Sequence, residues 1–256
     1  MNVLMVGDIF AKNGRTIFEK MLPKIKEKYK IDFIIANGEN ISHGKSISYN
    51  HFKFLKNLDV DVVTSGNHIF KKYEVLDYID NEKTLLKPIN INSYTPGNGT
   101  VILNKKGKKI QVTNIMGRVY MDNCDNPYPM FEKILEESNA DIHLVDFHAE
   151  ATAEKIAFAW NFDGKINALA GTHTHVQTAD ERILPKGTAF ISDIGMCGPI
   201  NSIIGVNPEE VIKNQKTGLL QKFNPAIGPS IFSAIVITID NKNNRTQSIE
   251  RILLKD

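Results

Sequence analysis

Residues 3–8 of the chain read Val3-Leu4-Met5-Val6-Gly7-Asp8, a short apolar run that stops at a glycine and an acidic residue. A run of this length and composition predicts a fully buried strand that ends in a loop. The pattern returns at Phe33–Ala36, which stops at Asn37-Gly38-Glu39-Asn40, and at Val60–Val63, which is followed by Ser65-Gly66-Asn67-His68. Three buried strands that each end in polar residues are therefore expected.

Between these runs the apolar residues recur at helical spacing among lysines and glutamates. The spacing predicts helices over Gly14–Lys28, around Phe52–Leu58, and over Lys72–Ile79. Alternating strands and helices favour right-handed crossovers and a mostly parallel sheet.

The rest of the chain carries antiparallel patterns as well. Two pairs of alternating segments are separated by turn residues, and further strands and helices lie between them. The expected hairpins are Thr100–Leu103 with Lys109–Asn114 and Ser233–Ile239 with Gln247–Leu254; the expected helices are Met130–Glu137 and Ala149–Trp160, and the strands Ile142–Val145 and Ile166–Ala170. We predict one α/β domain over residues 1–256, with a parallel half and an antiparallel half.

Composition excludes several classes of protein. The 256 residues carry 31 Lys+Arg and 29 Asp+Glu, a net charge of +2, and 42% of them are hydrophobic, so the chain is neither disordered nor a strongly basic nucleic-acid coat. No apolar run approaches the roughly 20 residues of a membrane helix. The opening residues do not resemble a secretory signal, and Cys124 and Cys197 cannot form a disulfide framework, so we expect a cytoplasmic protein with no membrane partner.

The most distinctive polar residues sit where strands end. Because ligands of open α/β sheets bind at the carboxyl ends of strands, we expect these residues to converge on one edge of the sheet. Their mixture of carboxylate, amide and imidazole donors suits Mn, Fe or Zn better than Ca or Mg. They exceed the needs of one tetrahedral ion and suffice for two ions that share a carboxylate. The residues are Asp8, Glu39, Asn40, Asn67, His68, His148, His173 and His175.

Each of these residues also has a structural interpretation. Asp8 and Asn67 are common helix caps or turn formers, Glu39 and Asn40 suit a solvated turn, and His148 suits a core position. The pair His173 and His175 is harder to explain structurally, because two imidazoles two residues apart in one loop can face the same cleft.

Other residues receive weaker hypotheses. His43 is a candidate for substrate contact because it lies close to Glu39 and Asn40 in the sequence, whereas His51 is expected on a helix surface and His143 in strand packing. Glu150 and Thr152 either orient a ligand histidine or cap a helix. Cys197 is expected to be a packing residue, and the apolar loop Gly195–Gly205 either a substrate wall or a subunit contact.

The order of these motifs resembles that of the calcineurin-like metallophosphoesterases. The match to their YmdB-like branch, bacterial 2′,3′-cyclic-nucleotide phosphodiesterases, covers nearly the whole chain. The segments that carry it are Val6-Gly7-Asp8-Ile9-Phe10, Asn37-Gly38-Glu39-Asn40, Ser65-Gly66-Asn67-His68, Asp146-Phe147-His148-Ala149-Glu150-Ala151-Thr152, Ala170–Asp180 and Ser192–Pro199.

This resemblance implies a four-layer αββα sandwich with two mixed sheets flanked by helices, and two transition-metal ions per chain, Fe or Mn first and Zn as the alternative. It assigns Asp8, Glu39, Asn40 and His175 to the first metal. Glu39, Asn67, His148 and His173 go to the second metal, and His68 is the general acid. Two features depart from the wider superfamily, which has Asp-x-His in the first motif and a bridging Asp. Here Phe10 and Glu39 take those positions, as in the YmdB-like branch.

Two metals would neutralise the phosphate and activate a water for in-line attack on phosphorus, while His68 protonates the leaving oxygen. The resemblance favours cyclic nucleotides of the 2′,3′ type, with RNA ends as a further partner and self-association allowed. Two alternatives stay open: a non-catalytic, metal-containing regulator that acts through protein or RNA contacts, and a phosphomonoesterase or protein phosphatase that uses the same site.

Overall fold

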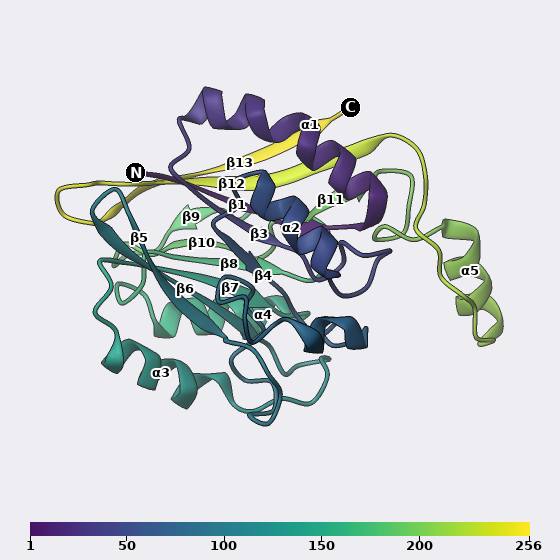
Figure 1. The fold of residues 1–256 in the computed structure, drawn as a ribbon, viewed down its shortest axis with the longest axis horizontal. Coiled ribbons are helices and arrows are strands. Elements are labelled where there is room, and N and C mark those ends of the chain that lie inside the picture. The colour runs from purple at the N-terminus through teal and green to yellow at the C-terminus, as the bar shows by residue number, and fades with distance from the viewer.

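The computed structural model describes residues 1–256, which form two mixed β-sheets packed face to face between helices (Figure 1). In the first sheet β1 runs parallel to β3, and β3 parallel to β4, whereas β12 is antiparallel to both β1 and β13. The order of this sheet is β2 (Asp8–Ile9), β11 (Met196–Pro199), β12 (Ser230–Ile239), β1 (Asn2–Val6), β3 (Phe33–Asn37) and β4 (Val62–Thr64), with β13 (Thr246–Lys255) paired to β12.

The second sheet has a parallel centre and antiparallel edges. β6 and β10 flank the parallel pair β7 and β8 and run in the same direction, while β5 and β9 pair antiparallel at the two edges. Its order is β5 (Thr100–Lys105), β6 (Lys108–Met116), β7 (Ile142–His148), β8 (Ala168–Thr172), β10 (Ala189–Ile191) and β9 (Arg182–Ile183).

Helices cover the outer face of each sheet. α1 (Ala11–Tyr29) and α2 (Tyr49–Asn57) pack Phe18 and Phe52 into a cluster with strands of the first sheet. α3 (Pro127–Glu137) and α4 (Thr152–Asn161) pack Phe131 and Phe158 against the second. A third cluster fills the space between the sheets with residues from both. The predicted four-layer αββα fold class is confirmed.

The central strands read as unbroken apolar runs because both of their faces are buried. In β1, Leu4 and Val6 pack under the helices, while Val3 and Met5 point into the layer between the sheets. No residue from Val3 to Val6 exposes more than 2% of its surface.

Three details of the predicted fold are wrong. The parallel strands are not confined to one half of the chain, because β6, β7, β8 and β10 make a second parallel set. The segment Lys72–Ile79 is not an α-helix but a 3₁₀ helix over Tyr73–Asp77 that lacks a side-chain cap and buries only Val75, too little to stabilise a longer helix. Residues 196–199 of the predicted loop Gly195–Gly205 form β11, which joins β2 to β12.

One helix has no counterpart in the sequence prediction. α5 (Pro208–Thr217) lies apart from the two sheets and buries none of its residues (Figure 1). No helix of the structure is both long and apolar enough to cross a lipid bilayer. Because one apolar layer is shared by both sheets, we keep the prediction that residues 1–256 fold as one domain.

Candidate metal centre

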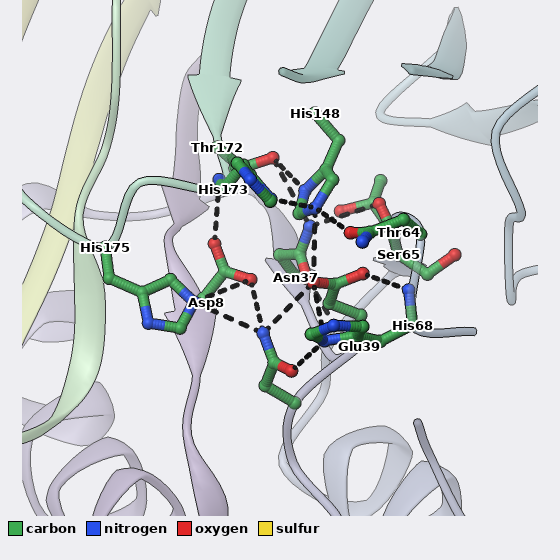
Figure 2. Close-up of polar contacts among 12 residues, drawn as sticks. Asp8, Asn37, Glu39, Thr64, Ser65, His68, His148, Thr172, His173 and His175 are labelled. Atoms are coloured by element: carbon green, nitrogen blue, oxygen red, sulfur yellow. Dashed lines mark hydrogen bonds and ion pairs between the residues drawn. The ribbon is translucent and has the colours of Figure 1, made fainter. Parts of the chain in front are cut away.

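The polar residues singled out in the sequence lie where strands of the two sheets end side by side. Asp8 follows β1, and Glu39 with Asn40 follows β3 in the first sheet; His148 ends β7, and His173 follows β8 in the second. The expectation of one edge of one sheet is therefore wrong. The residues meet because the face-to-face sheets bring the carboxyl ends of their parallel strands to the same end of the sandwich (Figure 2).

Four of these residues form a first group. Nδ2 of Asn40 lies 3.2 Å from Oδ1 of Asp8, 3.1 Å from Oε1 of Glu39 and 3.2 Å from Nε2 of His175. His175 in turn lies 3.6 Å from Oδ1 of Asp8. A half-turn of the Asn40 amide exchanges its oxygen and nitrogen with almost no change of shape, so the same position presents an oxygen ligand.

A second group gathers around Nε2 of His148. This atom lies 3.1 Å from Oε1 of Glu39, 3.1 Å from Nδ1 of His173 and 3.2 Å from Oδ1 of Asn67. Ligand atoms of Glu39, His148 and His173 all fall within 4.8 Å of one another, close enough to share one ion. Oε1 of Glu39 belongs to both groups, as a bridging ligand would.

The donor chemistry fits transition-metal ions. The two groups together offer carboxylate, amide and imidazole donors and no thiolate, a set that suits Mn, Fe or Zn. Asp8, Glu39, Asn40 and His148 are buried, with at most 1% of their surface exposed. Buried carboxylates require balancing positive charge, which bound cations supply.

Without metal, protons on histidines supply that charge. Burial alone would lower the pKa of His148, but the charges of Glu39 and Asp8 outweigh burial and raise that pKa to about 9. Burial would also lower the pKa of His175, but the charge of Asp8 outweighs burial and raises it. Burial would raise the carboxyl pKa values, yet His175 lowers that of Asp8 and His148 lowers that of Glu39. Burial and the charge of His148 lower the pKa of His173 to about 4.

Metal affinity is therefore expected to rise with pH up to about 9. A metal ion at the second group must displace the proton that His148 carries below the pKa of about 9, so each unit of decreasing pH weakens binding. We expect a loss of about tenfold per pH unit for each displaced proton, and release of at least one proton per chain on binding. Calorimetric titration with Mn²⁺ at pH 7, 8 and 9, in buffers of different ionisation enthalpy, measures both quantities. Circular dichroism over this pH range is the control for folding, and an affinity that is constant between pH 7 and 9 would contradict the expectation.

The loop that presents His173 and His175 is held in an uncommon conformation. Their φ angles are 103° and 65°, values that residues other than glycine rarely adopt. The backbone N–H of Thr174, between them, donates to Oδ2 of Asp193 at 3.0 Å, and the same oxygen accepts from Nζ of Lys155 at 2.9 Å. The buried Lys155–Asp193 ion pair thus holds the loop in place through the backbone N–H of Thr174.

A close backbone approach explains one glycine of the motifs. A Cβ on Gly66 would stand 2.2 Å from Nε2 of His148, the atom at the centre of the second group. Any larger residue at position 66 would displace that histidine, so here the glycine leaves room for the His148 ring rather than only forming a turn.

His68 lies beside both groups. Its Nδ1 is 2.8 Å from Oδ1 of Asn40 and 3.5 Å from Oε1 of Glu39, while its Nε2 has no hydrogen-bond partner in the protein. Its side chain is 30% exposed. Burial lowers the pKa of His68, and the charge of Glu39 only partly opposes this.

Other candidate residues have varied outcomes. His43 is exposed and packs near His51, with ring centroids 6.5 Å apart, and makes no hydrogen bond to either group. Oε2 of Glu150 lies 3.1 Å from Nε2 of His173, whereas Thr152 neither reaches a histidine nor caps α4, which begins after Ala151. In the segment Gly195–Gly205, the carbonyl of Ile204 lies 2.8 Å from Nδ1 of His175, so part of this segment borders the site.

The structural interpretations of three residues fit their positions. His51 is half-buried on α2, with Nδ1 2.6 Å from Oγ of Ser42. His143 packs in β7 with Nε2 2.8 Å from Oγ1 of Thr113. Cys197 is buried, and burial raises its thiol pKa to about 12, which rules it out as a nucleophile at neutral pH.

The polar residues behind the candidate ligands were not singled out from the sequence. Asp146, Thr172, Asn37 and Thr64 form a buried network beneath His148, and Asp122 accepts a hydrogen bond from Nδ2 of Asn67 at 3.5 Å. A polar residue inside a buried strand was the available signal, since Asp146 and Thr172 interrupt apolar runs just before or at their ends.

The chain matches one protein family and is similar to several known proteins over its whole length. The model of the family described as YmdB-like protein matches residues 4–252. A Bacillus subtilis (strain 168) protein named 2′,3′-cyclic-nucleotide 2′-phosphodiesterase is 42% identical to this chain, over 100% of this chain and 98% of that protein. Two crystal structures superpose closely. One, called a novel phosphatase, is from Mycoplasma pneumoniae (TM-score 0.96, 35% identity, 100% of this chain and 93% of that one). The other is a hypothetical protein from Thermus thermophilus (TM-score 0.95, 37% identity, 100% of both chains).

Proposed function

The chain belongs to the YmdB-like family, and from this premise we propose that it is a metal-dependent phosphodiesterase that hydrolyses cyclic nucleotides of the 2′,3′ type. The name of the Bacillus subtilis relative supports the substrate class. We assign Asp8, Glu39, Asn40 and His175 to one metal ion and Glu39, Asn67, His148 and His173 to the other, with Fe or Mn as the metals and Zn as the alternative.

One observation carries the proposal. A single carboxylate oxygen, Oε1 of Glu39, contacts both groups of ligands, at 3.1 Å from the Asn40 amide and 3.1 Å from Nε2 of His148 (Figure 2). A purely structural metal site is closed by four ligands around one ion. Two groups with a common carboxylate are the arrangement of two-metal hydrolytic sites.

When bound, the metal ions supply positive charge for the phosphate oxygens and a nucleophile from water at neutral pH. The protein supplies the remaining steps. Oε1 of Glu39, 3.5 Å from Nδ1 of His68, would stabilise the protonated ring, in which Nε2 carries a proton; donating that proton leaves a neutral imidazole. Because Nε2 has no protein partner and the side chain is 30% exposed, this proton is free for the leaving oxygen of the substrate. Proton donation of this kind typically contributes about 10²–10⁴-fold in rate.

Substrates and location follow from the same proposal. An RNA end that carries a 2′,3′-cyclic phosphate presents the same group as a cyclic nucleotide, so we include it in the substrate class. We also propose a cytoplasmic protein, which the two unpaired cysteines, Cys124 and Cys197, support. Self-association and substrate contact by His43 stay predictions.

Parallel assays on the Mn²⁺-loaded protein test the function. We expect hydrolysis of 2′,3′-cyclic AMP to exceed that of 3′,5′-cyclic AMP and of a phosphomonoester, because strain in the five-membered ring helps the leaving oxygen depart. Product analysis by chromatography identifies which P–O bond breaks, and chelator-treated protein is the control.

The outcomes separate the alternatives. Faster hydrolysis of the monoester would replace the proposal with a phosphatase, the activity named for the Mycoplasma pneumoniae structure. A protein that binds two metals and hydrolyses none of the three substrates would support the non-catalytic regulator instead.

A further inference from the structure

A chain of hydrogen bonds leads from His148 into the core. Nδ1 of His148 lies 2.9 Å from Oγ1 of Thr172, and Oγ1 of Thr172 donates to Oδ1 of Asp146 at 2.7 Å. All three residues are buried, with no more than 2% of their surface exposed. They come from the adjacent strands β7 and β8, in which Asp146 pairs with Ala170 and His148 with Thr172.

The other partners of Asp146 fix the direction of this chain. Oδ2 of Asp146 accepts from Oγ1 of Thr64 and, at 3.2 Å, from Nδ2 of Asn37. The amide NH₂ of Asn37 can only donate, so Asp146 must accept from it. As an ionised carboxylate, Asp146 has only acceptor oxygens, and it therefore also accepts the hydroxyl proton of Thr172. The lone pairs of Thr172 Oγ1 then face Nδ1 of His148, which must carry the ring proton.

The fixed proton decides which nitrogen His148 presents to the site. With the proton on Nδ1, the neutral ring has its free lone pair on Nε2, the atom that faces Glu39, His173 and Asn67. The opposite tautomer would offer the metal an N–H and leave the Thr172 hydroxyl in conflict with either His148 or Asp146. A carboxylate at the end of such a chain also makes the ligand nitrogen more basic.

We propose that Thr172 and Asp146 are positioning residues that hold His148 in its metal-binding tautomer through a hydroxyl relay. The inference rests on the proposed two-metal site and deepens it. Thr172 transmits the effect of Asp146 to His148, and neither residue touches the metal.

The relay predicts a selective loss of metal affinity. Thr172→Val removes the hydroxyl at constant shape, and we expect it to weaken one of two bound Mn²⁺ ions by about 10–100-fold, with the other ion little changed. Thr172→Ser restores the hydroxyl and should return affinity to near the wild-type value. Asp146→Asn removes the charge but keeps an acceptor for Thr172. We therefore expect it to weaken Mn²⁺ binding too, but less than Thr172→Val does.

A buried pair elsewhere in the same sheet supplies the matched control. Thr113 and His143 also form a buried hydroxyl–imidazole contact, at 2.8 Å, and neither residue belongs to the ligand groups. Thr113→Val therefore removes the same kind of hydrogen bond and should leave both Mn²⁺ affinities unchanged. Calorimetric titration at pH 8 measures the affinities, and thermal unfolding of the metal-free variants checks folding.

The result decides the proposal without any turnover measurement. Equal Mn²⁺ affinities for Thr172→Val and Thr113→Val, or failure of Thr172→Ser to restore binding, would overturn the relay. If Thr172→Val does not fold, Thr172→Ala takes its place in the same comparison. If the wild-type protein binds two ions but hydrolyses nothing, and Thr172→Val still shows the selective loss of affinity, the proposed function is refuted and the relay stands.

Discussion

Glu39→Gln is expected to abolish most metal binding and to lower the activity by at least about 10³-fold. The substitution keeps the shape of the side chain but removes the charge that both ligand groups share through Oε1. It also removes the partner that keeps His148 charged in the metal-free protein. Loss of several kcal/mol of charge stabilisation at a two-metal site corresponds to about 10³-fold or more in rate. Metal analysis after dialysis should fall from two ions to fewer than one per chain.

Glu150→Gln is the matched control for this prediction. Glu150 also lies beside a ligand histidine, at 3.1 Å from His173, but its side chain is 47% exposed and belongs to neither ligand group. Water screens its charge, so we expect two bound metals and less than about a tenfold loss of activity. If Glu39→Gln kept two metals and wild-type activity, Glu39 would not be the bridging ligand.

His68→Ala is expected to keep both metals and lose about 10²–10⁴-fold in kcat, with a small change in KM. The side chain contacts the ligand groups only through Nδ1, and its Nε2 is free of protein partners. The backbone N–H of His68, which donates to Oε2 of Glu39 at 3.0 Å, is kept in the variant. The loss should depend on the leaving group. A nitrophenolate leaves without help from an acid, so hydrolysis of bis-p-nitrophenyl phosphate should fall far less than that of 2′,3′-cyclic AMP.

His43→Ala provides the comparison for His68. It removes an exposed imidazole from a neighbouring loop that makes no hydrogen bond to the ligands. We expect kcat to be preserved, and a rise in KM alone would assign His43 to substrate contact. Equal losses for both substrates in His68→Ala, or a loss of bound metal, would show that His68 acts by holding the site together rather than as the acid.

The elements of the fold were predictable where the signal was local. Runs such as Val3–Val6 and Phe33–Ala36 form strands because continuous apolar character requires burial on both faces. Strand pairing was not predictable, since β1 pairs with both β3 and β12, and the latter lies more than 220 residues away. An apolar run records that a strand is buried but not which neighbour buries it.

The candidate site shows the same division. The sequence located Asp8, Glu39, Asn67 and His173, because polar residues at the ends of buried strands are conspicuous. It assigned them to one sheet edge, whereas they come from two sheets. The relay through Thr172 and Asp146 was out of reach, since it depends on the register between β7 and β8.

The sequence by itself therefore determined most of the strands and helices, the donor types of the site and, through the order of its motifs, the family. The tertiary structure alone decided that two sheets share one end, that Glu39 Oε1 faces both ligand groups, and which nitrogen of His148 faces the site. The reason is physical: burial and polarity are properties of single residues that the sequence displays, whereas a ligand group is defined by distances of about 3 Å that only packing between sheets can set.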